Sequence, residues 1–306
     1  MSARVAAIVV TYNRMQLLCE CLRALIKQTQ KVNEIFVVDN ASTDGTSRLF
    51  EADGEMAISR VTYIRLEQNC GGAGGFYEGV KKAFEAGYEW FWMMDDDGIP
   101  ASDCLQQLLG ISAHTNALFR APLVVNNKDH EALSFGYKIN GVIYFKRDEL
   151  IRKVRGRWFS GAQPFNGILV NRAVISKAGF PKKEMFIWGD EVEFLERCRF
   201  HGFAPITVAD AIFFHPKCRQ NWSPVFWGLF GADLRVNQLR LYCYYRNHAY
   251  TVLRYKGRIK LIFWALKHVI RKVICGRFTE STVVCEAIAD GSRGRWGRER
   301  RFLSAP

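Results

Sequence analysis

Apolar segments of strand length alternate with helical segments through the first 100 residues, and this alternation limits the possible folds more than any other feature. RVAAIVVT predicts a buried strand that ends at Thr11, and the following residues predict an amphipathic helix from about Met15 to Gln28. EIFVVD predicts a second buried strand, which ends at Asp39. Buried strands joined by helices are typical of an α/β protein whose mostly parallel sheet is covered by helices.

The alternation continues through the next two strands and weakens after them. VTYIRLEQN predicts a third strand, and after NCGGAGGF a helix is expected from about Tyr77 to Ala86. EWFWMMDDD predicts a fourth strand. Beyond Pro100 we expect a helix around Ser102–Ser112, short strands and loops over 120–160, a strand at Ile168–Val170 before a short helix that stops at Gly179, a helix that begins within GDEVE, and a strand that ends at His215.

Polar features follow each of the four predicted strands: Thr11, Asp39, the glycines of NCGGAGGF, and Asp95–Asp97. Ligands of open α/β sheets bind at the carboxyl ends of the strands, so these features are expected to share one rim. The sequence therefore predicts a ligand site at that rim.

Asp95, Asp96 and Asp97 form the most specific of these features. Adjacent carboxylates repel one another unless positive charge lies among them. Clustered oxygen ligands suit Mg²⁺ or Mn²⁺, which commonly link protein carboxylates to the phosphates of a substrate. The alternative is a solvated acidic turn. Because the preceding strand is apolar and a tight turn follows at Gly98, we favour a divalent cation that holds a diphosphate.

The glycines of NCGGAGGF match neither of two known phosphate-binding patterns. No register between Gly71 and Gly79 gives G-x-G-x-x-G, and the spacing from Gly74 to Gly79 is followed by Val80 where a P-loop has Lys. Two interpretations remain. The glycines allow the backbone to approach a nucleotide or a sugar closely, or they form a flexible turn before the helix.

Single polar residues in the rest of the rim each allow two interpretations. Asp39 can accept hydrogen bonds from a base or ribose, or it can cap its turn with Ser42 and Thr43. Together with the other rim features, ligand contact is the favoured interpretation. His215 ends a strand just before a proline, where an imidazole can complete the coordination of a metal or serve the structure alone.

Asp190 and Glu191 stand side by side at the start of the helix predicted within GDEVE. A carboxylate there can remove the proton from an acceptor hydroxyl group, which is all that general-base catalysis requires. Acidic residues in a first helical turn also interact favourably with the helix dipole, so a purely structural role competes with catalysis.

Positive charge is concentrated at the C-terminal end of the chain. Residues 1–216 contain 25 basic and 25 acidic residues, whereas residues 217–306 contain 18 basic and 5 acidic ones. This asymmetry predicts a neutral domain followed by a segment that meets an anionic surface, either membrane or nucleic acid.

The nine cysteines include no C-x-x-C pair, which favours reduced thiols in a cytoplasmic protein. Neither a signal peptide nor a membrane-spanning helix is expected from the sequence.

RIKLIFWALKHVIRKVICGRF, residues 258–278, is the most notable part of the basic segment. Its apolar residues recur at helical spacing, its basic residues include Lys260, Lys267, Arg271 and Lys272, and no acidic residue lies between Arg254 and Thr279. An amphipathic helix of this kind can lie on an anionic membrane face. The alternative is a core helix with a solvated basic side.

AIVVTYNR, FVVDNASTDGT, NCGGAGGF and WMMDDDG, in this order, resemble the inverting GT-A glycosyltransferases of family 2 over residues 4 to about 216. Six shorter motifs are similar to those of bacterial galactofuranosyltransferases, a group that includes the mycobacterial galactan-initiating enzymes. They are GGAGGF, DDDG, FNG, GDEVE, HP and YYRNHAY. Rhamnosyltransferases of the same family share several of them. The resemblance implies a GT-A catalytic domain over residues 1–216 and a mainly helical, basic region over 217–306.

The resemblance also implies a role for the matching positions. Thr11 and Asp39 would contact the uridine of the donor, and the expected donor site comprises Thr11, Asn13, Arg14, Asp39, Asn69, Gly71, Gly72, Gly74, Asp95 and Asp96. Asp95 and Asp97 would bind Mn²⁺ or Mg²⁺, with His215 as the third protein ligand.

At the acceptor side, Glu191 falls where the family places its catalytic base, with Asp190 beside it to orient a sugar, and Trp188 and Asn166 would contact the acceptor. Many relatives have Asp as the base, so the choice between Asp190 and Glu191 stays open. The implied donor is UDP-galactofuranose. The implied acceptor is a polyprenyl-diphosphate-linked glycan at the cytoplasmic face of the cell membrane.

Two other functions are compatible with parts of the sequence. A sugar nucleotidyltransferase should carry a glycine-rich loop with a basic residue in the first strand–helix turn, and TYNRMQ offers Arg14 but no glycine. A nucleic-acid-binding module would use the basic segment but leave the acidic rim unexplained. We therefore expect no nucleic-acid partner.

Overall fold

The chain forms two compact units in a computed structural model that describes residues 3–217, 222–225 and 232–303. The first unit comprises Met1–Phe180 and His201–Cys218, and the second comprises Pro181–Phe200 and Arg219–Pro306. The second unit thus takes in residues 181–200, which the sequence analysis placed within the catalytic domain 1–216.

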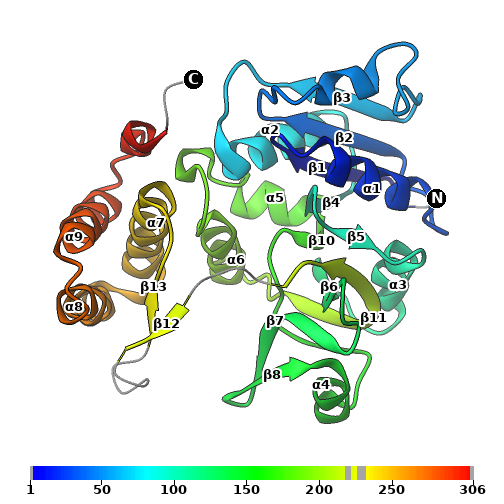
Figure 1. Ribbon diagram of the computed structural model, residues 1–306. Helices are drawn as coiled ribbons and strands as arrows, with labels where there is room; N and C mark the ends of the chain where they lie inside the picture. The colour runs from blue at the N-terminus through cyan, green and yellow to red at the C-terminus, as the bar shows by residue number, and fades with distance from the viewer. Residues whose placement is uncertain (1–2, 218–221, 226–231, 304–306) are drawn as a thin grey trace. The chain divides into compact units, whose positions relative to one another are not determined.

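The first unit is built on a sheet whose N-terminal half is parallel (Figure 1). Its strands lie in the order β3-β2-β1-β4. They span Val61–Arg65 (β3), Glu34–Asp39 (β2), Val5–Thr11 (β1) and Trp90–Asp95 (β4). All three neighbouring pairs are parallel, as the alternation of strands and helices predicts.

Beyond β4 the sheet is mixed, so the expectation of a mostly parallel sheet holds for its N-terminal half. The difference arises because β10 (Asn166–Asn171) runs antiparallel between β4 and β6 (Phe119–Asn126). β11 (Ile206–His215) then pairs parallel with β6. The remaining strands are β5 (Ile99–Pro100), β7 (Ala132–Ile139), β8 (Val142–Lys146) and β9 (Trp158–Ser160).

Helices of the first unit bury apolar faces against this sheet. They are α1 (Met15–Ile26), η1 (Thr46–Phe50), α2 (Gly71–Glu85), α3 (Cys104–Gly110), η2 (Ile111–Ala113), α4 (Arg147–Val154) and α5 (Arg172–Ala178). In α1, Leu18, Leu22 and Leu25 are fully buried in the same core as Val5 and Val9 of β1. The amphipathic helix predicted from Met15 is therefore confirmed.

Helix α2 begins at Gly71, so the predicted start at Tyr77 is wrong by about two turns. The physical reason is close packing of the helix on the sheet. A Cβ atom on Gly75 would lie 2.4 Å from Val10 Cγ1, and one on Gly79 would lie 2.5 Å from Ile8 Cγ2. Glycine at these positions lets the helix backbone approach β1, which outweighs the poor helix propensity of the residue.

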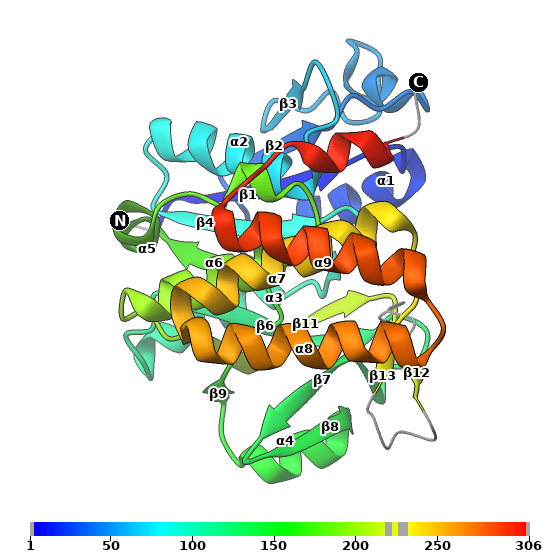
Figure 2. The ribbon, with the colours of Figure 1, turned by 90° about the vertical axis from the view of Figure 1, so that its left-hand side faces the viewer.

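The second unit is mainly helical. It contains η3 (Lys183–Met185), α6 (Asp190–Phe200), β12 (Trp222–Pro224), β13 (Ala232–Leu234), α7 (Gln238–Lys256), α8 (Arg258–Ile274), α9 (Phe278–Arg293) and η5 (Arg298–Phe302). Figure 2 shows α7, α8 and α9 side by side. Their core includes Leu241, Tyr242 and Tyr245 of α7 with Val284 and Ala287 of α9.

Helix α8 confirms the helix predicted within 258–278, and its burial is unusual. Leu261, His268 and Lys272 face the interior, whereas Ile259 and Phe263 are 72% and 70% exposed. The exposed apolar face of α8 consists of Ile259, Ile262, Phe263, Leu266, Ile270, Val273 and Ile274. Among the described residues, no helix is both long and apolar enough to span a membrane.

Candidate functional site

The strand register of the first unit places the predicted rim residues side by side. Thr11 at the end of β1 is paired with Asp39 at the end of β2, and Val10 of β1 is paired with Asp95 at the end of β4. The structure therefore brings these strand ends together at one edge, as expected for a parallel sheet.

Asp96 is the buried member of the acidic triplet. It is 2% exposed, its Oδ2 accepts a hydrogen bond of 2.7 Å from Thr11 Oγ1, and its Oδ1 lies 3.0 Å from Arg14 Nη1. Burial raises the pKa of Asp96 to about 6, against the opposing effects of Arg14 and Thr11. Asp96 is therefore a buried residue that fixes the side chains of Thr11 and Arg14 at the rim.

Arg14 supplies positive charge to the triplet. Its Nη1 lies 3.0 Å from Asp96 Oδ1 and 3.2 Å from Asp97 Oδ2, and its side chain is 45% exposed. The guanidinium is thus bound on one side by carboxylates and open to solvent on another. That arrangement leaves further donors for an anionic ligand.

Asp97 contacts His215, which ends β11. Asp97 Oδ1 lies 3.2 Å from His215 Nε2, and His215 Nδ1 lies 2.6 Å from the carbonyl oxygen of Pro216. Burial alone would raise the pKa of Asp97, but His215 and Arg14 outweigh burial and lower it. Asp97 is therefore held as a carboxylate.

The predicted metal ligands were Asp95, Asp97 and His215, and the structure brings Asp97 and His215 into contact. Among the described residues, no group of three or more His, Cys, Asp or Glu side chains is arranged to hold a metal ion. Mg²⁺ is usually held by one or two carboxylates together with substrate phosphates. An aspartate oxygen and a histidine nitrogen are both possible ligands of a divalent cation, and binding of a metal here stays a prediction.

Asp39 is fully buried, and both of its oxygens are bound by the protein. Oδ1 accepts from the backbone N–H of Ser42 at 2.8 Å, and Oδ2 accepts from the Tyr63 hydroxyl at 2.5 Å. Burial and Asp39 together raise the pKa of Tyr63 to about 12. The turn-capping role is thus present, and contact with the uridine stays a prediction.

Asn13 and Asn69 hold backbone at the rim. Asn13 has a positive φ of 52°, and its Oδ1 accepts from the N–H of Thr43 at 2.7 Å. Asn69 Oδ1 accepts from the N–H of Gly71 at 2.8 Å, at the first residue of α2. Both predicted donor-site residues therefore support loops of the rim, and their contact with the donor stays a prediction.

The glycines predicted for the donor site lie in the first turns of α2. Gly71 has a φ of +71°, and a Cβ on Gly72 would have no atom within 4 Å. A Cβ on Gly74 would lie 2.5 Å from Cys70 Cβ. Gly72 thus borders open space, unlike Gly75 and Gly79, so the glycines serve two different purposes.

Sequence reasoning missed two residues of this rim. Asn40 Oδ1 accepts from the N–H of Cys70 at 3.2 Å and so links the end of β2 to the start of α2. Arg65 ends β3, pairs in register with Asp39, and donates to the carbonyl oxygen of Ser42 at 2.9 Å. The rule that selected Thr11 and Asp39, a polar residue at a strand end, also selects Arg65.

Asn166 begins β10 beside the end of β4, where it pairs in register with Met94. Its Nδ2 donates to the carbonyl oxygen of Pro164 at 2.9 Å. Its Oδ1 is buried and has no hydrogen-bond partner in the described part of the chain. A buried acceptor without a donor is costly, so this oxygen is a candidate to bind a hydroxyl group of a ligand.

In the second unit, the start of α6 presents the predicted base. Asp190 is only 4% exposed, whereas Glu191 is half-buried, and Glu191 Oε2 accepts from the N–H of Gly189 at 2.7 Å. Trp188, the predicted acceptor residue, has a positive φ of 57°. Of the two carboxylates, Glu191 is the more accessible to a substrate.

Tyr244 and His248 of α7 lie near Glu191, and sequence reasoning gave neither a role. Burial raises the pKa of Tyr244 to about 12, and the charge of Glu191 adds to the effect. Burial lowers the pKa of His248, although Glu191 opposes that shift. Both residues belong to YYRNHAY, which the sequence analysis noted as a motif.

An open cavity of about 450 Å³ in the first unit lies away from these residues. It is lined by Glu89, Trp90, Asn171, Arg172, Ala173 and Ser176. Trp90 begins β4, whereas the acidic triplet follows the end of that strand. The cavity therefore belongs to the opposite edge of the sheet.

Comparison with known proteins agrees with this architecture. The model of the family described as "Glycosyl transferase family 2" matches residues 6–162. The galactofuranosyltransferase GlfT1 of Mycolicibacterium smegmatis is 31% identical over 264 residues, which cover 84% of this chain and 85% of that protein. The dTDP-rhamnosyl transferase RfbF of Shigella flexneri is 26% identical over 218 residues, 70% of each chain.

The fold is also found among solved structures. A structure of GalNAc-T7 with UDP, GalNAc and Mn²⁺ superimposes with a TM-score of 0.59 at 16% identity. The match covers 83% of this chain and half of the longer protein. The family and the fold that the motifs indicated are therefore confirmed: the chain belongs to glycosyl transferase family 2 and is a glycosyltransferase of the GT-A fold.

Proposed function

We propose that this glycosyltransferase moves galactofuranose from UDP-galactofuranose onto a polyprenyl-diphosphate-linked glycan, with inversion at the anomeric carbon, in cell-surface polysaccharide synthesis. The observation that carries the proposal is the rim of the first unit, where Arg14, Asp97 and His215 converge at the ends of β1, β4 and β11. The choice of sugar is supported by the identity of 31% with a galactofuranosyltransferase over most of both chains.

The diphosphate of the donor is proposed to bind where Arg14, Asp97 and His215 come together. Asp97 and His215 would hold Mn²⁺ or Mg²⁺, with Asp95 of the neighbouring strand end as the further predicted ligand. When bound, such a cation neutralises charge that develops on the leaving diphosphate. Arg14 adds a second positive group at the same place, because its side chain is 45% exposed while it contacts Asp96 and Asp97.

The nucleoside and sugar are assigned to the remaining rim residues. The proposed donor site consists of Thr11, Asn13, Asp39, Asn69, Gly71, Gly72, Gly74 and Asp96. Gly72 borders open space in it. Asn166, by contrast, is proposed to contact the acceptor, because its Oδ1 is buried, has no partner among the described residues and would accept a hydrogen bond from an acceptor hydroxyl group. Such a group disfavours a ligand without a hydroxyl there, since the oxygen would stay unsatisfied.

Glu191 is proposed as the base, with Asp190 to orient a sugar and Trp188 to contact the acceptor. As the acceptor oxygen forms its bond to the anomeric carbon, the proton of that hydroxyl passes to Glu191. The bond from the anomeric carbon to the diphosphate oxygen breaks, and UDP leaves with the electron pair. A single displacement from the opposite face inverts the anomeric centre and requires no covalent intermediate.

The acceptor's lipid carrier places the enzyme at the cytoplasmic face of the cell membrane in this proposal. The exposed apolar face of α8 supports this location, and Arg258, Lys260, Lys267 and Arg271 lie on the same helix. Apolar side chains would enter the interface while each basic residue near anionic lipid adds about 1 kcal/mol.

The alternative donor is dTDP-rhamnose, which the relative from Shigella flexneri favours at 26% identity. Purified protein with Mn²⁺ should be incubated with UDP-galactofuranose and dTDP-rhamnose in separate reactions, and the nucleotide released should be measured. We expect faster release of UDP. Faster release of dTDP would overturn the choice of sugar and leave the glycosyltransferase assignment unchanged.

A further inference from the structure

A buried asparagine of α7 binds the backbone that leads to the proposed base. Asn247 is fully buried, and its Nδ2 lies 2.9 Å from Met185 O, 3.0 Å from Ile187 O and 2.8 Å from Trp188 O. One side-chain amide thus contacts three carbonyl groups of a single loop. That loop ends where α6 begins, one residue before Asp190.

The loop has a backbone conformation that needs such support. Phe186 has φ 64° and ψ −77°, Trp188 has φ 57°, and Gly189 has φ 96°. Non-glycine residues rarely adopt positive φ, and they keep it only where the surrounding structure holds them. The Phe186 side chain is buried in the core with Leu241 and Tyr245, which fixes one side of the loop.

Gly189 connects the loop to the carboxylate. A Cβ atom at this position would lie 3.0 Å from both Asn247 Cβ and His248 Nδ1, so the backbone of Gly189 rests directly on α7. The N–H of Gly189 donates to Glu191 Oε2 at 2.7 Å. The position of α7 therefore sets the position of the hydrogen-bond donor that holds Glu191.

Arg246 holds Asn247 in turn. Its side chain is fully buried, its Nε donates to Asn247 Oδ1 at 3.0 Å, and its Nη2 donates to Met185 O at 2.8 Å. Its Nη1 forms an ion pair with Glu299 of η5, which is 4% exposed. Because Asn247 Oδ1 is occupied by Arg246, its Nδ2 must face the loop.

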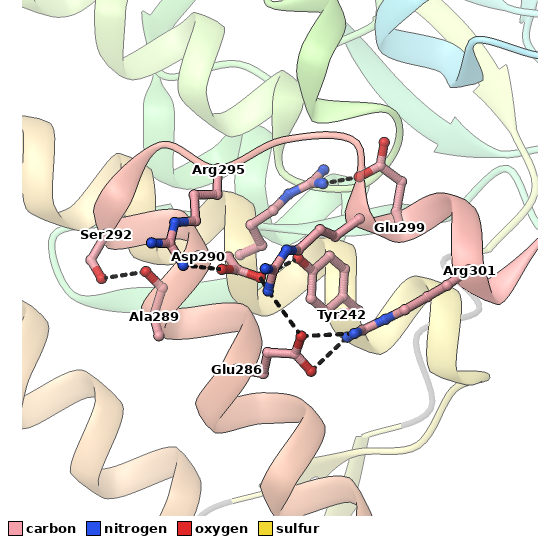
Figure 3. Close-up of polar contacts among 10 residues, drawn as sticks. Tyr242, Glu286, Ala289, Asp290, Ser292, Arg295, Glu299 and Arg301 are labelled. Atoms are coloured by element: carbon pink, nitrogen blue, oxygen red, sulfur yellow. Dashed lines mark hydrogen bonds and ion pairs between the residues drawn. The ribbon is translucent and has the colours of Figure 1, made fainter.

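Further ion pairs fix the segment that supplies Glu299. Arg301 makes two contacts with Glu286, of 2.7 and 2.6 Å, and the Tyr242 hydroxyl donates to Asp290 at 2.8 Å (Figure 3). These contacts join η5 to α9 and α9 to α7. A continuous series of contacts therefore runs from the C-terminal segment through Arg246 and Asn247 to the loop that holds Glu191.

We infer that Arg246 and Asn247 are positioning residues that fix Glu191 through the loop 185–189, with Glu299 as their anchor. The inference rests on the proposed role of Glu191 as the base. Neither residue needs to touch a substrate, because each acts on the backbone that carries the carboxylate. Small displacements of a reacting group lower rates steeply, so loss of these contacts should lower kcat.

Asn247→Asp tests the inference with almost no change of shape. The substitution keeps the oxygen that accepts from Arg246 but turns a second oxygen toward the three carbonyls, where it cannot donate. Asn237→Asp is the matched control on the same helix. Asn237 caps α7 by accepting from the N–H of Arg240 at 3.0 Å, a task that an aspartate performs equally well.

The assay measures transfer of galactofuranose from UDP-galactofuranose to a synthetic polyprenyl-diphosphate-linked glycan. We expect Asn247→Asp to lower kcat by about 10²-fold with little change in the KM for donor, and Asn237→Asp to match the unsubstituted enzyme. In a Glu191→Gln background, Asn247→Asp should cause no further loss, because the two residues act through one group. A further loss there, or an unchanged kcat in the single variant, overturns the inference.

Two additional variants keep the test decisive. If Asn247→Asp does not fold, Arg246→Lys replaces it, since lysine retains a charge for Glu299 but cannot also reach Asn247 and Met185 O. We expect kcat to fall by about 10-fold or more for Arg246→Lys, and an unchanged kcat overturns the inference. Glu191→Gln alone separates the two proposals: full transfer in that variant refutes the base itself, whereas loss of transfer there with normal Asn247→Asp refutes only the positioning.

Discussion

His215 Nε2 lies 3.2 Å from Asp97 Oδ1, while His215 Nδ1 lies 2.6 Å from the carbonyl oxygen of Pro216. A carbonyl oxygen only accepts hydrogen bonds, so Nδ1 carries the proton. Burial would raise the pKa of Asp97, but His215 and Arg14 lower it, so the carboxylate stays ionised beside the imidazole ring. A carboxylate oxygen and an imidazole nitrogen in contact are both possible ligands of a divalent cation, and the first prediction concerns this pair.

Asp97→Asn should remove the negative charge of the pair and keep its size. We expect binding of Mn²⁺ in the presence of UDP to weaken, as followed by electron paramagnetic resonance, and kcat to fall by about 10²-fold or more. Treatment with a chelator should inactivate the unsubstituted enzyme, and added Mn²⁺ should restore it. Asp53→Asn, at an exposed carboxylate, is the control. Full activity of chelated protein would contradict the prediction.

The exposed apolar face of α8 gives the second prediction. Replacing both Ile262 and Phe263 by Glu should abolish binding to vesicles that contain anionic lipid, as measured by co-sedimentation. Each buried apolar side chain contributes about 2 kcal/mol, so the loss should be on the order of 10²-fold or more. Binding of the unsubstituted protein should also weaken with added salt.

Phe145→Glu is the matched control for membrane binding, because Phe145 is 61% exposed on β8 of the first unit. It should bind vesicles like the unsubstituted protein. Equal loss of binding in both variants would remove α8 from the proposal. Tight binding to duplex DNA without binding to vesicles would favour the nucleic-acid alternative.

The parallel half of the fold and its rim could be predicted because their determinants are local. Apolar strands that end at Thr11, Asp39 and Asp95 follow from periodicity, and parallel pairing then places their carboxyl ends together. The antiparallel insertion of β10 could not be predicted in this way. It depends on pairing between β4 and β10, which are distant in sequence, and periodicity carries no information on partners.

The start of α2 and the role of YYRNHAY were missed for a related reason. Glycines have poor helix propensity, so Gly75 and Gly79 read as a loop until the contacts with Val10 and Ile8 are known. Asn247 reads as an ordinary polar residue of a helix. Its role depends on three carbonyl groups of a loop that has unusual backbone angles, and no sequence pattern encodes those angles.

The two kinds of glycine in α2 give the third prediction. Gly79→Ala should lower the free energy of unfolding by about 1–3 kcal/mol, because its Cβ would lie 2.5 Å from Ile8 Cγ2. Gly72→Ala should leave stability unchanged or slightly higher, since that Cβ meets open space. Urea unfolding measures both effects. If Gly72 borders the donor, as proposed, its variant should raise the KM for donor, whereas a normal KM would remove Gly72 from the donor site.

His268 gives a fourth prediction, on stability and pH. Burial, with the nearby charges of Arg271 and Lys267, lowers its pKa from 6.5 to about 4. Below pH 6.5 the unfolded chain gains a proton on this residue before the folded protein does, so the contribution to stability is lost as pH falls from about 6.5 to about 4. Between about pH 7.5 and pH 5 the loss should be about 2 kcal/mol.

His268→Gln removes the titrating group and keeps an acceptor for the Tyr245 hydroxyl, which lies 3.2 Å from His268 Nδ1. Urea unfolding near neutral and mildly acidic pH should therefore show a smaller loss of stability on acidification in this variant than in the unsubstituted protein. His114→Gln, at an exposed histidine, is the control and should retain the full loss. If the two variants show the same dependence on pH, burial of His268 does not govern the acid sensitivity of the second unit.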